Sequence, residues 1–317
     1  MVLAGLMVSF LSGCAGMDIG SNIEGYGYLV TGNYRGGTER FQEIVQEKPA
    51  SAEANFYLGR FLLAQKKAGK ALPYLKKAAR LGPENADYQF WLGVAYGELK
   101  KTGKETAQYR KVLLLDNSYT TAHLYLGHNQ LKKGQIKKAL ASYNSVLKLS
   151  PGNKSALYNR ALVMHILGRT PEEKLAWRIF LWKYRSGTMA IRATEHLNRL
   201  RDFSYRNHKL GFRQITLTKI WFKAFEKKLS KASFKSLNLV GEIVSNMPRN
   251  TLQVVVYQKN NKELAKARAE SIRDYLVKNF SSLDGRVRIS WFDVDDVVTA
   301  RGKKLSIGES VRFFLTR

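Results

Sequence analysis

The stretch TTAHLYLGHNQLKKGQIKKALASYNSVLKLSPGN, residues 120–153, decides the fold of the first part of the chain. It predicts two helices joined by a short turn, each with small or apolar residues along one face. The positions that mark the pattern are Leu126, Gly127, Gly134, Ala139, Tyr143, Val146 and Pro151. Gly127 lets the second helix pack close to the first. Pro151 ends the second helix, because proline cannot continue one.

The same pattern recurs every 34 residues on both sides of this stretch. A small residue stands at Gly25, Gly59, Gly93, Gly127 and Ala161, and a leucine precedes it at Leu58, Leu92 and Leu126. A helix-ending residue stands at Pro49, Pro83, Asn117 and Pro151. This period resembles the tetratricopeptide repeat, a helix-turn-helix unit whose stacked copies form an α-helical solenoid. The resemblance implies five units: 18–51, 52–85, 86–119, 120–153 and 154–187.

The first and last units depart from the repeat. Gly36 and Gly37 fall inside the second helix of unit one, where each glycine weakens a helix by roughly 1 kcal/mol relative to alanine. Unit five has Arg160, Glu173 and Trp177 where the repeat has apolar or small residues. Atypical end units are expected, because they face solvent or a neighbouring domain.

In tetratricopeptide repeats the concave groove is lined by the fifth, sixth and ninth residues of each first helix. The resemblance therefore predicts a protein-binding groove with an aromatic row and a basic edge, which suits a peptide with apolar anchors. Its candidate residues are Phe56, Tyr57, Arg60, Phe90, Trp91, Tyr125, His128, Lys132 and Tyr158. The alternative is that these aromatic residues belong to the core, since stacked repeats bury much of the first helix.

The chain is strongly basic, with 53 Lys and Arg against 25 Asp and Glu, a net charge of +28 over 317 residues. The excess is spread over residues 52–187 and 188–317. Such a field favours polyanionic surroundings, which include anionic lipid, acidic proteins and nucleic acid. The other interpretation is that lysines make the outer helix faces soluble.

The N-terminal residues 1–14 form an apolar run that is too short to span a bilayer and suits the core of a secretory signal peptide. Its last four residues, Leu11-Ser12-Gly13-Cys14, resemble a bacterial lipobox. The resemblance implies that the Cys14 thiol is acylated and anchors the protein to a membrane. Ala15 after the cysteine then predicts that the anchored protein is located at the periplasmic face of the bacterial outer membrane. The alternative is an apolar tail with an incidental cysteine.

After Gly187 the 34-residue period stops. Residues 188–212 read as a helical linker with a polar boundary at 204–209, and the periodicity then changes to that of strands and helices. The expected strands are 213–222, 252–257, 286–291 and 311–315, with helices at about 230–247 and 261–279. The order β-α-β-α-β-β predicts a small α+β domain, residues 213–317, with helices on one face of a sheet.

This order resembles the C-terminal, peptidoglycan-binding domain of the outer membrane protein A family. The matching residues are Leu229, Ser230, Asn261, Leu264, the run 268–272 and the closing strand. In that family an arginine and an aspartate grip the stem peptide, and Arg268 stands where the arginine would be. The family's Gly-His-Thr-Asp is replaced here by residues 256–259, Val-Tyr-Gln-Lys. Three interpretations of Arg268 follow: peptidoglycan binding by another mode, protein docking, or a solvated helix residue without a ligand.

The sequence contains no pattern that predicts catalysis, a cofactor or a metal. The five histidines, His123, His128, His165, His196 and His208, lack metal-ligand spacing. The acidic residues Asp293, Asp295 and Asp296 lack the spacing and glycine of a calcium loop.

The sequence as a whole favours a non-catalytic envelope lipoprotein that acts as a protein-binding scaffold or assembly factor in secretion or pilus machinery. The alternative function is a peptidoglycan-binding tether between the outer membrane and the cell wall. A nucleic-acid binder is the third hypothesis, and the absence of a recognition motif counts against it.

Overall fold

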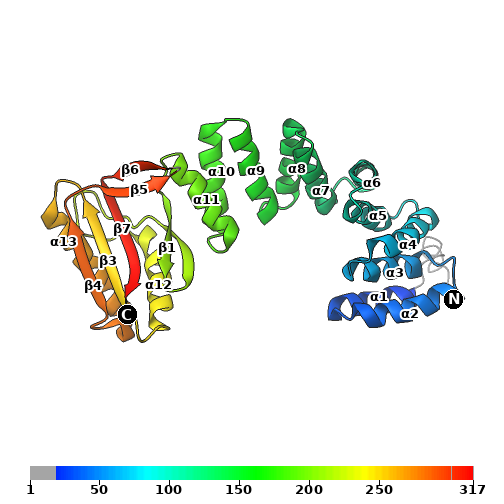
Figure 1. Ribbon diagram of the computed structural model, residues 1–317, viewed down its shortest axis with the longest axis horizontal. Helices are drawn as coiled ribbons and strands as arrows, with labels where there is room; N and C mark the ends of the chain where they lie inside the picture. The colour runs from blue at the N-terminus through cyan, green and yellow to red at the C-terminus, as the bar shows by residue number, and fades with distance from the viewer. Residues whose placement is uncertain (1–18, 301, 317) are drawn as a thin grey trace, which may run out of the picture. The chain divides into compact units, whose positions relative to one another are not determined.

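The computed structural model describes residues 19–300 and 302–316, and these fall into two compact units that divide between residues 151 and 152 (Figure 1). Cys14 and the proposed signal peptide lie outside the described residues. None of the described helices has the length and apolar character that crossing a membrane requires.

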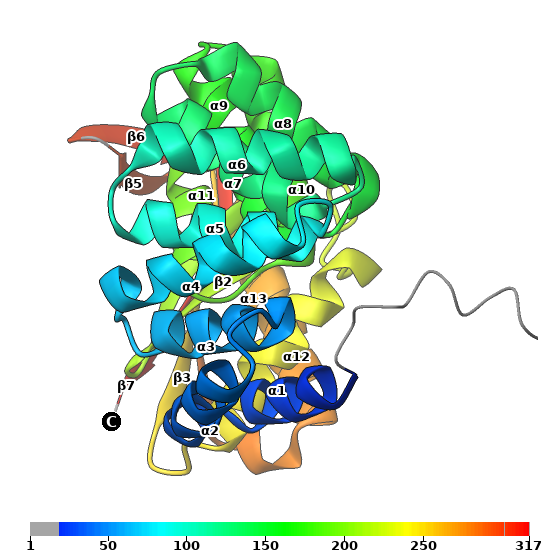
Figure 2. The same cartoon turned by 90° about the vertical axis from the view of Figure 1, so that its right-hand side faces the viewer.

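The N-terminal unit consists of four helical hairpins (Figures 1 and 2). They are α1 (Ile19–Thr31) with α2 (Tyr34–Glu47), α3 (Ala52–Ala64) with α4 (Ala68–Leu81), α5 (Ala86–Glu98) with α6 (Thr102–Leu115), and α7 (Thr120–Lys132) with α8 (Ile136–Leu149). Each hairpin lies inside one of the first four repeats predicted from the 34-residue period. The period therefore predicted the helices of this unit correctly.

The periodic small residues hold the two helices of a hairpin close together. A Cβ added to Gly59 would lie 2.5 Å from Cγ of Leu75, and one added to Gly127 would lie 2.8 Å from Cε1 of Tyr143. Both facing side chains are completely buried, so neither has room to move away. The expectation that these positions admit only a small residue is confirmed by the packing.

Local contacts explain where helix α3 begins and why α2 contains a glycine at position 37. Ser51 Oγ accepts a hydrogen bond from the backbone N–H of Ala54 and caps α3. Helix α2 continues through both of its glycines. A Cβ on Gly37 would lie 2.9 Å from the ring of the buried Phe61, so this glycine is needed for packing despite its low helix propensity.

The C-terminal unit begins with three helices and continues with a small α+β domain (Figure 1). The helices are α9 (Lys154–Ile166), α10 (Thr170–Lys183) and α11 (Thr188–Arg199). The later elements are β1 (Tyr205–Leu210), β2 (Arg213–Thr218), α12 (Lys231–Ser245), β3 (Thr251–Gln258), α13 (Lys262–Asn279), η1 (Ser281–Leu283), β4 (Val287–Phe292), β5 (Asp296–Ala300), β6 (Lys303–Ile307) and β7 (Glu309–Thr316). The fifth predicted repeat therefore forms its two helices, α9 and α10, within the C-terminal unit.

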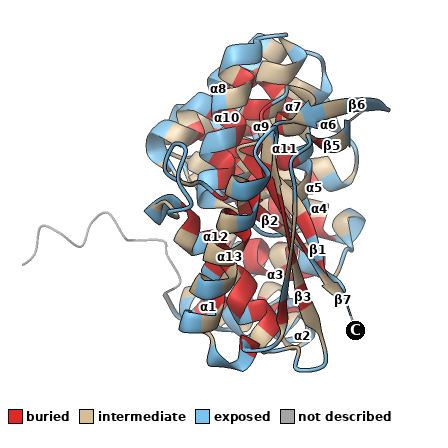
Figure 3. Cartoon of the chain, turned by 90° about the vertical axis from the view of Figure 1, so that its left-hand side faces the viewer, coloured by how far each residue is buried: buried red, intermediate tan, exposed pale blue. Residues whose placement is uncertain are grey.

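Strand β3 is the centre of a three-stranded sheet of order β4-β3-β7, parallel to β4 and antiparallel to β7. Helix α13 packs on β3 and β4, and α12 packs on α13 and β2. Figure 3 shows the buried residues of both helices on the sides that meet the strands. The core between these layers includes Leu237, Val240, Val254, Ile272 and Phe313, which are nearly or completely buried.

The structure confirms six expected elements of this domain and corrects the linker. Residues 205–210, which we expected in the 188–212 linker with its polar boundary at 204–209, form β1 and pair with β2 in an antiparallel hairpin. Gly211 turns the hairpin with φ +60°. Tyr205, His208 and Leu210 are buried among polar neighbours, so the strand does not show clean apolar alternation. The β5–β6 hairpin was also missed.

Candidate functional site

The nine residues of the predicted groove do not form one exposed surface. Phe90 and Tyr158 are 5% and 7% exposed and pack in the cores of their units, where Phe90 contacts Tyr109 and Tyr158 contacts Trp177. Their assignment to an open groove is therefore wrong, because large aromatic side chains fill the space between successive helices. Tyr125, by contrast, is 38% exposed.

Two further predicted residues lie near Tyr125. The His128 ring stands 6.0 Å from the Tyr125 ring and is half-buried, and burial lowers the pKa of this histidine. Lys132, one turn further along α7, is exposed.

The remaining four residues meet in one pocket of the N-terminal unit, which we call the Arg60 pocket. It has a volume of about 420 Å³ and lies between α1, α3 and α5. Its lining consists of Asn22, Tyr26, Phe56, Tyr57, Arg60, Asn85, Asp87, Tyr88 and Trp91. Tyr26 is 64% exposed and belongs to the open side, whereas the side chains of Phe56 and Tyr57 are largely buried in the wall.

Arg60 is the cationic group of this pocket. Its guanidinium carbon lies 4.1 Å from the centre of the Trp91 ring and 5.4 Å from that of Phe56, distances of cation–π contacts. Its Nε atom is buried and has no hydrogen-bond partner within the described part of the chain. Burial lowers the pKa of Arg60, but a guanidinium keeps its charge in proteins. The pocket therefore contains a cation whose Nε–H is unpaired and shielded from solvent.

Asp87, the acid of the pocket, already accepts a hydrogen bond from within the protein. Tyr119 Oη donates a hydrogen bond of 2.6 Å to Oδ1 of Asp87. Burial first, and this carboxylate second, raise the pKa of Tyr119. Asp87 stands in the first turn of α5, where the helix dipole also favours a negative charge. Arg60 makes no ion pair within the described residues, so a ligand carboxylate would not have to displace an internal acid.

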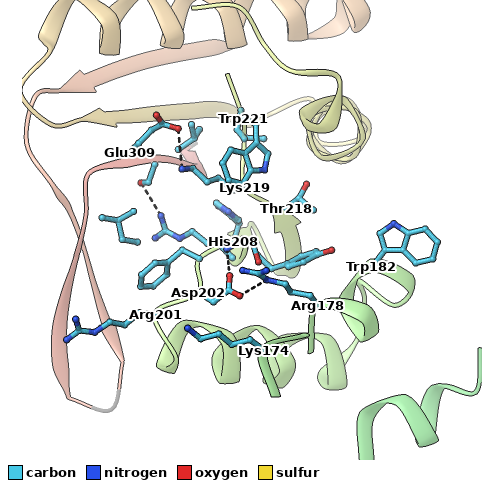
Figure 4. A pocket seen from close by; sticks show the side chains of 18 of the residues that line it. Lys174, Arg178, Trp182, Arg201, Asp202, His208, Thr218, Lys219, Trp221 and Glu309 are labelled. Atoms are coloured by element: carbon cyan, nitrogen blue, oxygen red, sulfur yellow. Dashed lines mark hydrogen bonds and ion pairs between the residues drawn. The ribbon is translucent and has the colours of Figure 1, made fainter. Parts of the chain in front are cut away.

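A larger cavity of about 790 Å³ lies within the C-terminal unit (Figure 4). Two tryptophans are exposed at its edge, Trp182 by 70% and Trp221 by 43%. The basic residues of the lining are Lys174, Arg178, Arg201, Arg206 and Lys219. Its apolar walls and basic side chains would suit an amphipathic anionic ligand.

Both acids of this cavity are paired with bases. Arg178 Nε lies 2.7 Å from Oδ2 of Asp202, and Lys219 Nζ lies 3.2 Å from Oε1 of Glu309 (Figure 4). Although burial opposes ionisation of Asp202, hydrogen bonds from Ser204 and Arg178 lower the pKa of its carboxyl group. These acids therefore partly neutralise the basic lining.

Arg268 is an internal structural residue. It is 3% exposed, donates to Oε2 of Glu309 at 2.8 Å and to the Glu226 carbonyl at 3.1 Å, and also donates to Gln258. Its guanidinium carbon lies 4.5 Å from the Phe222 ring centre. The solvated-helix interpretation is contradicted, because the donors of Arg268 are directed at the protein interior. Peptidoglycan binding through this residue stays a prediction.

Two of the acidic residues that follow β4, Asp295 and Asp296, have internal partners as well. Asp296 is completely buried and pairs with Arg206 at 2.6 Å and with Arg312. Asp295 pairs with Lys259 at 3.1 Å. Asp296 thus joins strands β1, β5 and β7.

Sequence reasoning missed one group of polar residues. His165, Glu173 and His196 come from α9, α10 and α11 and meet in the C-terminal unit. The departure of Glu173 from the repeat was visible in the sequence, but the separation of 31 positions between the two histidines hid their contact.

Comparison with known proteins supports the repeat assignment. The tetratricopeptide repeat family profile matches residues 24–85, 62–118 and 124–177. A Pseudomonas aeruginosa PilF structure is 17% identical, covers 58% of this chain and 83% of its own, and has a TM-score of 0.53. A MamA structure is 20% identical, covers 58% of this chain and 98% of its own, and has a TM-score of 0.45. YrrB, described as a TPR protein with an unusual peptide-binding site, is 16% identical, covers 58% of this chain and 94% of its own, and has a TM-score of 0.48.

None of the curated proteins compared with the chain matches it. The resemblance to the outer membrane protein A family therefore finds no support among these comparisons. The helical hairpins of residues 24–118 and 124–177 are tetratricopeptide repeats.

Proposed function

We propose that this protein is a non-catalytic scaffold that binds a partner protein through its repeats. The observation that carries the proposal is the Arg60 pocket, in which a guanidinium without an ion-pair partner among the described residues lies over the half-buried ring of Trp91. Repeats of this family usually hold other proteins, and a pocket that combines an aromatic wall with a cation suits a peptide anchor. A scaffold of this kind needs no cofactor.

The chemistry of the pocket selects the ligand. Trp91 and Tyr26 offer aromatic surface, and Arg60 offers a charged donor beside it. A peptide with an apolar or aromatic side chain next to a carboxylate would use both features. A hydrogen bond to a charged group contributes about 1.5–3 kcal/mol, so losing this contact should weaken binding about tenfold to a hundredfold.

A peptide array tests this selection. The purified full chain is applied to peptides that pair an aromatic residue with Asp or Glu, and to matched peptides with Asn or Gln. We expect acidic peptides to bind best and Arg60→Gln to abolish that preference. Arg80→Gln, an exposed arginine on α4, is the matched control. Equal binding of acidic and neutral peptides by the wild type would refute the role of Arg60.

We further propose that the scaffold acts at the periplasmic face of the outer membrane, anchored through Cys14, as an assembly factor of secretion or pilus machinery. The lipobox-like residues 11–14 and the net charge of +28 support this placement. Metabolic labelling with a palmitate analogue tests it: the wild type should incorporate label and sediment with outer membranes. Cys14→Ala should do neither. Unlabelled, cytoplasmic wild type would remove the envelope proposal and leave the peptide-binding proposal standing.

The peptidoglycan tether is less well supported, because Arg268, the residue on which it rested, is buried and paired. Sedimentation of the full chain with purified sacculi decides between the two functions. A scaffold without cell-wall affinity stays in the supernatant at moderate salt.

A further inference from the structure

Three potential metal ligands converge where α9, α10 and α11 meet. Nδ1 of His165 lies 3.0 Å from Oε1 and 3.1 Å from Oε2 of Glu173, and Nδ1 of His196 lies 3.5 Å from the same Oε1. One ligand atom from each residue lies within 4.8 Å of the other two. We call this group the His-Glu-His cluster. It is remote in sequence from the Arg60 pocket and independent of the peptide-binding proposal.

The spacing of the cluster fits a small divalent ion. Zinc binds imidazole nitrogen and carboxylate oxygen at about 2.0–2.2 Å, so tetrahedral ligand atoms stand about 3.3–3.6 Å apart. The 3.5 Å separation from His196 to Glu173 falls in this range, and the 3.0 Å separation from His165 lies slightly below it. Two imidazoles and one carboxylate are a ligand set that zinc and other first-row transition metals accept.

The carboxylate is held in place by its surroundings. Glu173 is 2% exposed, and Trp177 Nε1 donates a hydrogen bond of 3.1 Å to its Oε1. The indole ring of Trp177 also stacks on His196, with ring centres 4.6 Å apart and planes at 24°. Such outer contacts orient ligands in metal sites. One residue therefore positions two of the three ligands.

The Nδ1 atom of His196 is a potential metal ligand without a hydrogen-bond partner among the described residues. This atom is buried and makes no hydrogen bond, because 3.5 Å to Glu173 is too long for a good one. A buried polar atom without a partner costs free energy. Coordination would satisfy this nitrogen together with the buried carboxylate.

The fourth position opens into a cavity of about 320 Å³ beside the cluster. Its lining includes the three candidate ligands together with Arg199, Leu200, Arg201, Lys303 and Leu305. The three basic side chains disfavour a bare cation, so the site requires Glu173 and an anion to balance the charge. A hydroxide or a carboxylate from a small acid would meet both the metal and these cations.

We propose that His165, Glu173 and His196 bind one divalent transition metal, zinc foremost, with an open fourth position for an anionic ligand. This explains why unit five has Glu173 and Trp177 where the fourth unit has Ala139 and Tyr143.

Zinc titration of the full chain tests the proposal. The protein is purified without a histidine tag and carries Cys14→Ser throughout, so that neither a tag nor the thiol binds metal. We expect one zinc per chain by elemental analysis and a matching four- or five-coordinate visible spectrum with cobalt. His165→Asn, Glu173→Gln and His196→Asn should each weaken zinc binding more than about tenfold. Trp177→Phe should weaken it by about tenfold through loss of orientation.

Glu105→Gln is the matched control, because Glu105 is a buried acid at the equivalent position of the third unit without histidine neighbours. It should leave zinc binding unchanged. If Glu173→Gln unfolds the chain by circular dichroism, the 38% exposed side chain of His165 makes His165→Asn the deciding variant. Absence of stoichiometric zinc in the wild type, or zinc affinity unchanged in His165→Asn, would overturn the proposal.

Discussion

Replacing Gly93 by alanine should destabilise the N-terminal unit, although alanine is the better helix former. An added Cβ would lie 2.7 Å from Cε1 and 3.0 Å from Cδ1 of Tyr109. Real Cβ atoms essentially never approach a ring this closely, and Tyr109 is completely buried. The ring has no free space to enter, so the helices of the hairpin must move apart.

The size of the effect follows from two opposing contributions. Adding a methyl group to a packed core costs about 1–3 kcal/mol, and the tight contact with a fixed ring favours the upper end. Replacing a helical glycine by alanine returns up to about 1 kcal/mol. The net loss for Gly93→Ala is about 2 kcal/mol, which corresponds to about 4–8 °C in the melting temperature of a unit of this size.

The same substitution at Gly103 is the control. This glycine belongs to α6 of the same repeat, and nothing lies within 4 Å of an added Cβ. Gly103→Ala should therefore raise the free energy of unfolding by about 0.5 kcal/mol. Thermal unfolding of the full chain, followed by circular dichroism, measures both shifts. If Gly93→Ala melts at or above the wild-type temperature, the close-packing explanation of the 34-residue period is refuted.

Two further predictions concern the C-terminal unit. Arg268→Met should lower the free energy of unfolding by about 2 kcal/mol in urea titrations, because its charged hydrogen bond to Glu309 is lost and Glu309 keeps only Lys219 as a basic partner. An unchanged midpoint would contradict the structural role of Arg268. Burial foremost lowers the pKa of His208 to about 3, below the ordinary value of 6.5. Below pH 6.5 the unfolded chain therefore binds a proton at His208 that the folded chain does not bind. As the pH falls from 6.5 to 3, the free energy of unfolding decreases by about 1.4 kcal/mol per pH unit. His208→Gln should reduce by about one the number of protons taken up on unfolding, measured as the slope of the free energy of unfolding against pH. Equal slopes in wild type and variant would contradict this role of His208.

The repeats could be predicted because one constraint recurs along the chain. A facing pair such as Gly59 and Leu75 must pack at the same place in successive units, so the period is readable without any three-dimensional information. The helices and strands of residues 231–292 were also predictable, since their apolar residues follow helical or alternating patterns.

The binding surface was only partly predictable, because position in a repeat does not determine exposure. Arg60 and Phe90 occupy equally regular positions, yet Arg60 lines a pocket and Phe90 is core. Arg268 was misinterpreted for a similar reason. Its partner Glu309 lies 41 residues away on the last strand, a pairing that the sequence does not indicate.

The repeat also shows how the chain accommodates a buried acid at a position built for alanine. Ala139 fills this position in the fourth unit, whereas Glu105 and Glu173 fill it in the third and fifth. In the third unit Gly97, eight residues earlier, makes room: a Cβ there would lie 2.7 Å from Oε1 of Glu105. In the fifth unit the same place is held by His165, whose nitrogen contacts the carboxylate directly. The two units thus accommodate the buried acid differently: Gly97 leaves space for Glu105, whereas the His165 imidazole contacts Glu173. A buried acid alone requires only the first solution, so the histidines around Glu173 point to a task beyond packing.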